Sequence, residues 1–222
     1  MLAEAVGTGL LVTAVIGSGI AAQRLSPGDI GLQLLENAIA TGAALTVLIW
    51  VLQPVSAAFN PAVTMIDRLA RTISTGDAAG LIIGQLAGGA GGAVLANLMF
   101  QLPAVSLSTK GRDGLGRLLA EVVATAGLVL VIMMLSRSGR SGLIAPAVGG
   151  YITAAYWFTS STSFANPAVT IARMFSDTFS GIAPHSVPGF LLAQLIGALG
   201  GYFLARTLIP MQEHDRDRQP TH

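Results

Sequence analysis

The chain carries the sequence Asn-Pro-Ala-Val-Thr twice, at residues 60–64 and again at residues 166–170. Asparagine is among the best helix N-caps and proline is favoured at the first helical position, so each copy predicts the start of a short helix. The N-terminus of a helix carries roughly half a positive charge, and an asparagine amide offers N–H donors. A single copy is an ordinary helix start. Two copies can place two such ends around one neutral oxygen and repel a cation.

Two further residue types repeat around this motif. Glu4 reappears as Glu121 behind an alanine, and Gln85 reappears as Gln194 ahead of a glycine three residues later. The matches occur in the same order along the chain and at similar spacings. We interpret the sequence as an internal repeat whose two halves each position one Asn-Pro-Ala box.

The composition is that of a membrane protein. The 222 residues are 52% apolar and 10% charged, whereas soluble domains carry about 25% charge, so the charges are too few to coat a soluble surface. The net charge of +1 gives no indication of nucleic-acid binding. There is no cysteine, and the three histidines are scattered, so we expect no metal site, no disulfide and no cofactor.

Six apolar segments are long enough to cross a bilayer, which takes roughly 20 residues. They span about 2–22, 31–53, 79–100, 115–136, 142–159 and 188–209. Segments near 60–70 and 166–176 are too short to cross. We predict an all-α membrane protein with one channel domain over 1–209, built from repeat 1 (about 2–100) and repeat 2 (about 115–209). A polar C-terminal tail follows at 210–222.

Three crossings per half are an odd number, so the second half enters the membrane from the opposite side. The predicted fold is therefore an inverted repeat with a pseudo-two-fold axis in the membrane plane. The two short helices then enter from opposite faces and point their positive ends at one place near the midplane. A narrow pore built this way repels cations and protons and accepts a neutral solute or water.

The distribution of basic residues favours cytoplasmic termini. With both termini inside, seven basic residues lie on the inner side and five on the outer side. The inner set is Arg68, Arg71, Arg137, Arg140, Arg206, Arg216 and Arg218, and the outer set is Arg24, Lys110, Arg112, Arg117 and Arg173.

The doubled box and the paired Glu and Gln positions resemble the aquaporin and aquaglyceroporin family of major intrinsic proteins, here with a bacterial type of sequence, over residues 2–209. The resemblance implies six tilted helices plus two re-entrant half-helices, one pore per subunit and a homotetramer in the inner (plasma) membrane. It implies passive conduction of water and small neutral solutes rather than enzyme activity. The pore residues it implies are Asn60, Pro61, Ala62, Asn166, Pro167 and Ala168.

The resemblance also implies a bracing role for Glu4 and Glu121, together with Gln85 and Gln194. In the family such glutamates accept hydrogen bonds from the backbone of the opposing half-helix loops. The alternative is a proton relay, because an acid inside the membrane is a functional-site candidate by default.

The expected selectivity filter departs from the family pattern. Counting from the boxes places Ala40, Ala154, Ser163 and Val169 at the filter positions, and Val169 stands where the family usually has arginine. A small shift in register at position 154 would instead bring Tyr156 or Trp157 into the pore. The family histidine before the first box is also replaced, by Ala58.

One arginine follows the second box at a distance of one helical turn. Arg173 lies four residues after Val169, on the same helix face, and helical side chains lean back toward the N-terminus. Arg173 either reaches the filter from the outer mouth or is a solvated helix end. Its repeat mate, Asp67, is expected to face the pore at the inner mouth.

A filter of small residues without arginine is expected to pass glycerol-like polyols, urea or neutral metalloid acids such as arsenite, together with water. A water-selective pore is the alternative. A proton-coupled secondary transporter would need titratable groups at the midplane, and only Glu4 and Glu121 qualify. The hydroxyl run of residues 160–163 fits loop packing better than catalysis.

Overall fold

The computed structural model describes residues 1–209, and every regular element in that range is helical. The helices are α1 (Leu2–Leu25), α2 (Ile30–Leu52), α3 (Pro61–Leu69), α4 (Thr75–Met99), α5 (Leu115–Arg137), α6 (Ile144–Phe158), α7 (Pro167–Arg173) and α8 (Val187–Leu208). Short 3-10 turns at Ser141–Leu143 and Pro184–Ser186 lead into α6 and α8. The predicted tail at 210–222 lies outside the described residues.

Within residues 1–209 five helical units are long and apolar enough to cross a membrane: α1, α2, α4, α5 and the unit from Pro184 to Leu208. The remaining predicted span, 142–159, which is the fifth along the chain, is in the right place but is shorter than expected. Its helix, α6, has 15 residues, which rise about 22 Å against a hydrocarbon core of about 30 Å. The 3-10 turn before α6 and the loop after it complete this pass.

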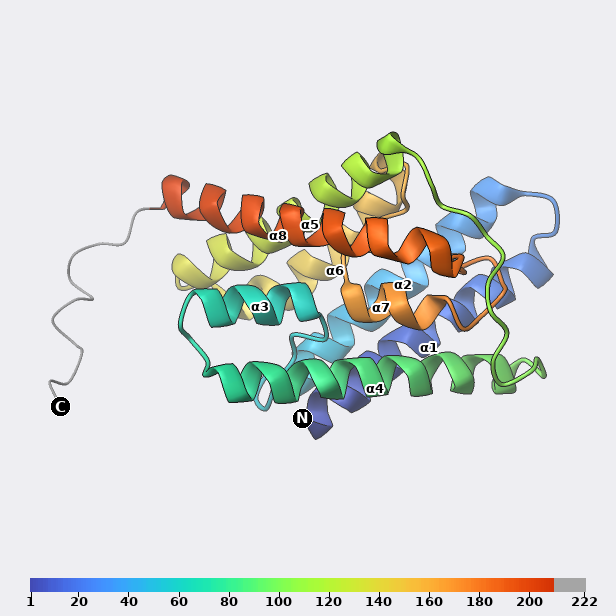
Figure 1. Cartoon of the computed structure of the whole chain (residues 1–222), viewed down its shortest axis with the longest axis horizontal. Helices are drawn as coiled ribbons and strands as arrows, with labels where there is room; N and C mark the ends of the chain where they lie inside the picture. The colour runs from blue at the N-terminus through green and yellow to red at the C-terminus, as the bar shows by residue number, and fades with distance from the viewer. Residues whose placement is uncertain (210–222) are drawn as a thin grey trace, which may run out of the picture.

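The short helices α3 and α7 lie between the long ones, with their N-terminal ends facing each other near the centre of the molecule (Figure 1). The second half-helix ends at Arg173 and not at the predicted residue 176. In Figure 1 the loop between α4 and α5 lies at the right end, whereas α8 ends at the left. The half-helices therefore run from the centre toward opposite ends, as the inverted repeat requires.

Glycines allow the long helices of each half to pack closely. A Cβ at Gly88 or Gly92 of α4 would overlap the backbone of α1. The equivalent positions of the second half, Gly197 and Gly201 of α8, would overlap the backbone of α5. Membrane helices rely on such small residues because lipid gives them no hydrophobic drive to associate, and close backbone approach maximises packing contacts.

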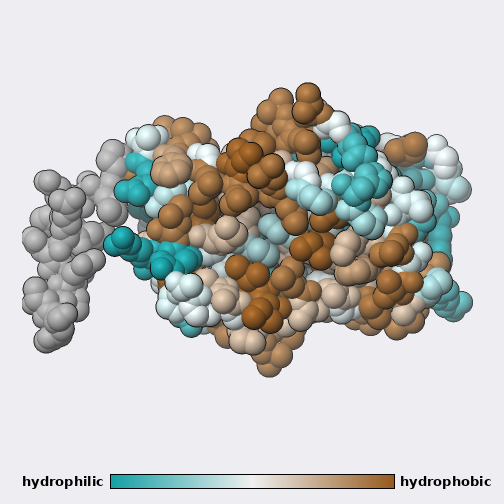
Figure 2. Space-filling view, in the orientation of Figure 1, coloured by the Kyte–Doolittle hydropathy of each residue, from teal (hydrophilic) through white to brown (hydrophobic). Residues whose placement is uncertain are grey.

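The outer surface is largely apolar. Large apolar side chains such as Trp50 (66% exposed) and Leu115 (85% exposed) point away from the protein. On the face shown in Figure 2, brown apolar groups cover much of the middle of the molecule, and teal polar groups gather mainly toward its two ends. This distribution fits a protein whose waist is surrounded by lipid.

Candidate functional site

Each Asn-Pro-Ala box starts a half-helix in the way the sequence predicts. The Oδ1 atom of Asn60 accepts a hydrogen bond from the Ala62 N–H at 2.9 Å, and Asn166 Oδ1 accepts from the Ala168 N–H at 3.0 Å. A proline occupies the first turn of each half-helix, where its missing N–H costs nothing. Both helix N-termini are thereby capped by the residues that also face the centre of the molecule.

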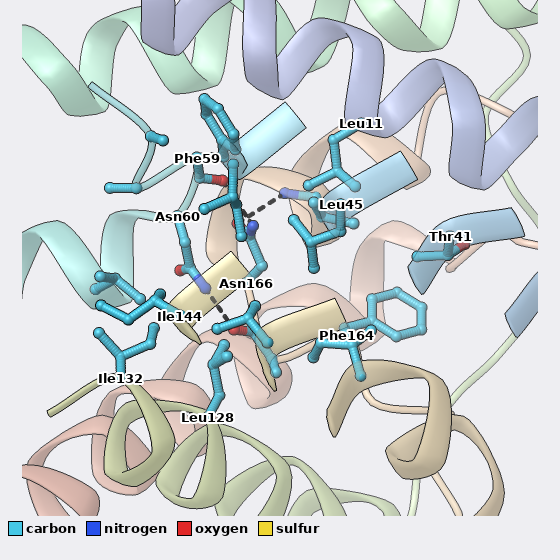
Figure 3. A pocket seen from close by; sticks show the side chains of 18 of the residues that line it. Leu11, Thr41, Leu45, Phe59, Asn60, Leu128, Ile132, Ile144, Phe164 and Asn166 are labelled. Atoms are coloured by element: carbon cyan, nitrogen blue, oxygen red, sulfur yellow. Dashed lines mark hydrogen bonds between the residues drawn. The ribbon is translucent and has the colours of Figure 1, made fainter. Parts of the chain in front are cut away.

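The two asparagines also bond across the repeat, a feature that the sequence reasoning missed. The amide of Asn60 donates to the carbonyl of Ala165 at 2.8 Å, and the amide of Asn166 donates to the carbonyl of Phe59 at 2.7 Å (Figure 3). Each amide carries two hydrogens, so one N–H remains for a molecule in the pore. The boxes are therefore a structural joint as well as a donor pair.

The residue before each asparagine has an unusual backbone conformation. Phe59 and Ala165 both have φ of 48°, in the left-handed region that side chains other than glycine rarely adopt. Their carbonyls accept the cross-repeat bonds described above, and their N–H groups bind buried carboxylates. The surrounding hydrogen bonds therefore hold a backbone that would otherwise cost about 1–3 kcal/mol per residue.

Glu4 supplies the carboxylate for the first half. Its Oε1 accepts from the Ser56 hydroxyl at 2.5 Å and the Ala58 N–H at 2.9 Å, and its Oε2 accepts from the Phe59 N–H at 2.7 Å and the Gln85 amide at 2.6 Å. The side chain is fully buried. Four donors satisfy this buried negative charge without any basic partner.

Glu121 does the same in the second half. It accepts from the N–H groups of Phe164 and Ala165, both at 2.9 Å, and from the Gln194 amide at 2.7 Å. The predicted bracing is thus present, but the expectation that each glutamate would hold the opposing loop is wrong. Each holds the loop of its own half, because the helix that carries it packs beside that loop. Neither glutamate lines the cavity described next, which gives a proton relay no path through them.

A cavity of about 300 Å³ runs past both boxes. Asn60 and Asn166 are its central polar groups, and most of the remaining wall is made of aliphatic side chains (Figure 3). The aliphatic lining residues include Leu11, Val15, Leu45, Ile49, Val63, Leu128, Ile132, Ile144, Val148 and Ile152. Such a wall offers an ion no replacement for its water shell.

At one end of the cavity the structure corrects two predicted filter positions. Ala40 and Ala154 do not line the cavity, and Ala154 is exposed on the outside of α6. Their places are taken by Thr41 and Tyr156, which line the cavity and are joined by a hydrogen bond from the tyrosine hydroxyl at 3.3 Å. The alternative register with Tyr156 is therefore the one observed.

The other two predicted filter residues, Ser163 and Val169, do line the cavity, and Arg173 lies there with them. Arg173 is not a solvated helix end, because only 2% of its side chain is exposed. Its guanidinium carbon lies 3.4 Å from the centre of the Phe164 ring.

The loop between α4 and α5 brings further basic groups to this end. Arg112 is buried and donates through Nε to the Gly181 carbonyl at 2.8 Å. Its guanidinium carbon lies 4.8 Å from the centre of the Phe164 ring, the same ring that Arg173 contacts. Lys110 donates to the Phe179 carbonyl at 2.7 Å. Burial, together with the nearby arginines, lowers the pKa of Lys110 to about 8. Three basic side chains, Lys110, Arg112 and Arg173, thus lie at this end.

The opposite mouth has one acidic group in the wall. Asp67 of α3 lines the cavity, as the repeat relation to Arg173 predicts. The cavity thus has a basic wall group at one end and an acidic one at the other. Within residues 1–209 no cluster of His, Asp or Glu is arranged to hold a metal ion.

The chain is similar to known membrane channels along most of its length. The family model described as major intrinsic protein matches residues 1–162, a region that ends just before the second box. Aquaglyceroporin AqpS of Rhizobium meliloti (strain 1021) is 51% identical over 209 residues, which cover 94% of this chain and 89% of that protein.

A solved structure has the same fold. The aquaglyceroporin of Plasmodium falciparum superimposes with a TM-score of 0.72 at 19% sequence identity, covering 94% of this chain and 95% of its own. The all-helical inverted repeat is thus shared with a distant protein. Taken with the family match and the 51% identical relative, the paired boxes and their cavity show that this multi-pass membrane chain belongs to the major intrinsic protein family.

Proposed function

We propose that this protein is a passive transmembrane channel for small neutral solutes and that it excludes ions and protons. The observation that carries the proposal is the single cavity of about 300 Å³ on which both half-helix asparagines lie. Each asparagine keeps one amide N–H that is not used in the joint between the halves. A neutral oxygen passing this point is met by two donors and two positive helix ends.

The same arrangement opposes cations. A cation would meet two positive helix N-termini at the centre and the Arg173 guanidinium at the basic mouth. Most of the wall between them is aliphatic, so few oxygens are present to replace the hydration shell of an ion. A channel of this kind conducts without an enzymatic step and without a bound cofactor.

Glycerol-like polyols, urea and neutral metalloid acids such as arsenite are the proposed solutes, with water passing alongside. The similarity to a protein named as an aquaglyceroporin supports this choice. A water-selective pore is the second candidate, because the large side chains of Tyr156 and Arg173 line the cavity, whereas the small Ala154 does not. Proton-coupled transport finds less support, because both buried glutamates lie off the cavity.

We further propose that residues 1–209 act as one domain in the bacterial inner membrane, with both termini in the cytoplasm. The excess of basic residues on that side supports the orientation. In that orientation Asp67 lies at the inner mouth and Arg173 at the outer mouth. The exposed apolar faces of the helices fit contacts with lipid and with neighbouring copies in a homotetramer.

The test is stopped-flow light scattering on proteoliposomes under water, glycerol and urea gradients, extended to arsenite uptake. Wild-type protein is expected to exceed the permeability of the lipid alone for at least one solute. A Val169→Trp variant should remove the excess by filling the cavity. Val51→Trp, at a position 68% exposed on the surface of α2, is the matched control and should keep it. No flux above lipid for any solute would contradict the proposal.

A further inference from the structure

Arg173 is a buried cation that faces the cavity without an acidic partner. Within residues 1–209 the one ion pair joins Asp113 to His185, and both of these side chains are more than half exposed. A buried charge is costly when nothing compensates it. The cavity is therefore where the Arg173 guanidinium finds partners, and those partners are molecules that enter the pore.

Two contacts fix the orientation of this guanidinium. Its Nε donates to the Ser180 carbonyl at 2.5 Å, and its plane packs on the Phe164 ring. Ser180 is held in turn, because its hydroxyl donates to the Val15 carbonyl of α1 at 2.9 Å. The terminal amino groups of Arg173 make no hydrogen bond to any other residue in the described range. They form a rigid pair of donors for two oxygens.

Ser163 provides a second polar group without a partner. Its hydroxyl is buried, has no hydrogen bond to any residue of 1–209, and belongs to the wall of the same cavity. The hydroxyls of Tyr156 and Thr41 also lie on this wall and bond to each other. Four polar side chains from α2, α6, α7 and the loop before α7 thus gather in a cavity whose remaining wall is mainly aliphatic.

The position of Arg173 along α7 explains how it reaches the lumen. Val169 lies one turn nearer to Asn166 on the same face, and the side chain of Arg173 leans back over that turn. Because Val169 is short, it leaves the guanidinium uncovered. A charged side chain at position 173 enters the lumen one helical turn further from Asn166 than a charged side chain at position 169 would. One turn is about 5 Å along the helix axis.

We infer that Arg173 is the specificity-determining cation of this channel and that, with Ser163, Tyr156 and Thr41, it forms a subsite for solutes that present two oxygens on one side. This inference rests on the proposed channel function. A polyol with neighbouring hydroxyls or an undissociated oxyacid can accept both terminal N–H groups while its other side faces the aliphatic wall. Urea has a single carbonyl oxygen and uses only part of the subsite. The channel therefore favours glycerol over urea.

The inference is tested by the ratio of glycerol to urea permeability in proteoliposomes. The variants are Arg173→Ala, Arg173→Lys and Ser163→Ala. In Arg173→Ala the ratio is expected to fall about tenfold, the effect of one lost hydrogen bond to a charged group. Arg173→Lys keeps the positive charge but loses the paired donors, so the ratio falls while potassium leak stays at the wild-type level.

The matched control is Arg117→Ala, which removes the same charge from an exposed side chain beside the loop between α4 and α5. It is expected to keep the wild-type ratio. If Arg173→Ala does not yield folded protein, Arg173→Lys and Ser163→Ala decide the question, because both retain most of the packing.

An unchanged ratio in Arg173→Lys and Ser163→Ala, in protein that conducts both solutes, would overturn the inference and leave the channel function standing. A wild-type protein that conducts neither solute would overturn both. The two failures are therefore distinguished by the wild-type flux alone.

Discussion

The two halves of the chain share one hydrogen-bonded core and differ in what surrounds it. In the first half Glu4 holds the backbone before Asn60, and Gln85 links that glutamate to Thr64 at 2.9 Å. In the second half the same links run through Glu121 and the backbone before Asn166, with Gln194 donating to Thr170 at 2.8 Å. The correspondence extends to the left-handed residue before each asparagine.

The surroundings of the two cores are different. The chain passes from α3 to α4 through a short turn. After α7 it instead forms a long loop that pairs with the loop between α4 and α5, for example through the Ala183 N–H and the Lys110 carbonyl at 2.8 Å. Among the described residues both buried arginines, Arg112 and Arg173, lie beside the second core, whereas Ser56 and Thr64 supply hydroxyls to the first. The comparison teaches that the two halves build the joint at the boxes alike, whereas the buried arginines lie at one end only.

The largest expected effect comes from breaking either core. Glu4→Ala leaves the N–H groups of Ala58 and Phe59 without an acceptor and removes one of the two acceptors of the Gln85 amide, each loss worth about 1–3 kcal/mol. We expect the variant to lose its cooperative thermal unfolding in detergent. The measurement is fluorescence-detected size exclusion of the heated variant beside the heated wild type. Glu121→Ala should behave alike.

A suitable control for the glutamates is Glu36→Ala, since Glu36 is only partly buried and accepts from one side chain, that of Ser26. It is expected to unfold close to the wild-type temperature. A stable Glu121→Ala beside an unstable Glu4→Ala would show that the two cores are not equivalent.

The next effect tests the helix pairs that support each core. An alanine at Gly88 would press on the α1 backbone and one at Gly197 on the α5 backbone, so each is expected to cost about 1–3 kcal/mol. Gly91→Ala and Gly200→Ala are the matched controls, because nothing lies within 4 Å of the added methyl group. The readout is the melting temperature of purified protein. Equal losses at Gly88 and Gly91 would argue against the close approach of α1 and α4.

A smaller effect probes the joint between the halves. Asn60→Ala and Asn166→Ala each remove a helix cap, worth about 0.5–2 kcal/mol, and one cross-repeat hydrogen bond. The double variant is expected to lose less than the sum of the single losses, because the two bonds fix the same pair of loops. Thermal unfolding of the four proteins gives the coupling energy. Strict additivity would mean that the halves are joined elsewhere.

The sequence was sufficient to predict the parts that local chemistry determines. Asparagine caps, proline at the first turn and long apolar runs are local signals, and they place α3, α7 and the spanning helices within a few residues. The doubled Glu and Gln positions likewise predict which side chains are buried together. The repeat relation also places Asp67 and Arg173 on the cavity wall.

The parts that were missed depend on helix rotation and on contacts between distant segments. A helix turns about 100° per residue, so an error of one or two residues in the register points to a different face of the helix. The prediction chose Ala40 and Ala154, whereas Thr41, one residue later, and Tyr156, two residues later, line the cavity. The bonds from each asparagine to the opposite loop span more than a hundred residues. No local pattern encodes such a pairing.

The smallest expected effect concerns the acidic end of the cavity. Asp67 is the repeat mate of Arg173, but Arg173, the one arginine of the wall among the described residues, lies at the other end, and the Ser56 hydroxyl of the wall donates to Glu4 and not to Asp67. A neutral solute gains little from an isolated carboxylate beside the open mouth. Asp67→Asn is therefore expected to change the free-energy barrier for glycerol permeation by less than about 1 kcal/mol. The measurement is the glycerol efflux rate in the proteoliposomes used for Arg173. A glycerol-to-urea ratio that changes as much in Asp67→Asn as in Arg173→Ala would mean that selectivity is shared by both mouths. The contrast between a symmetric core and a one-sided filter would then no longer hold.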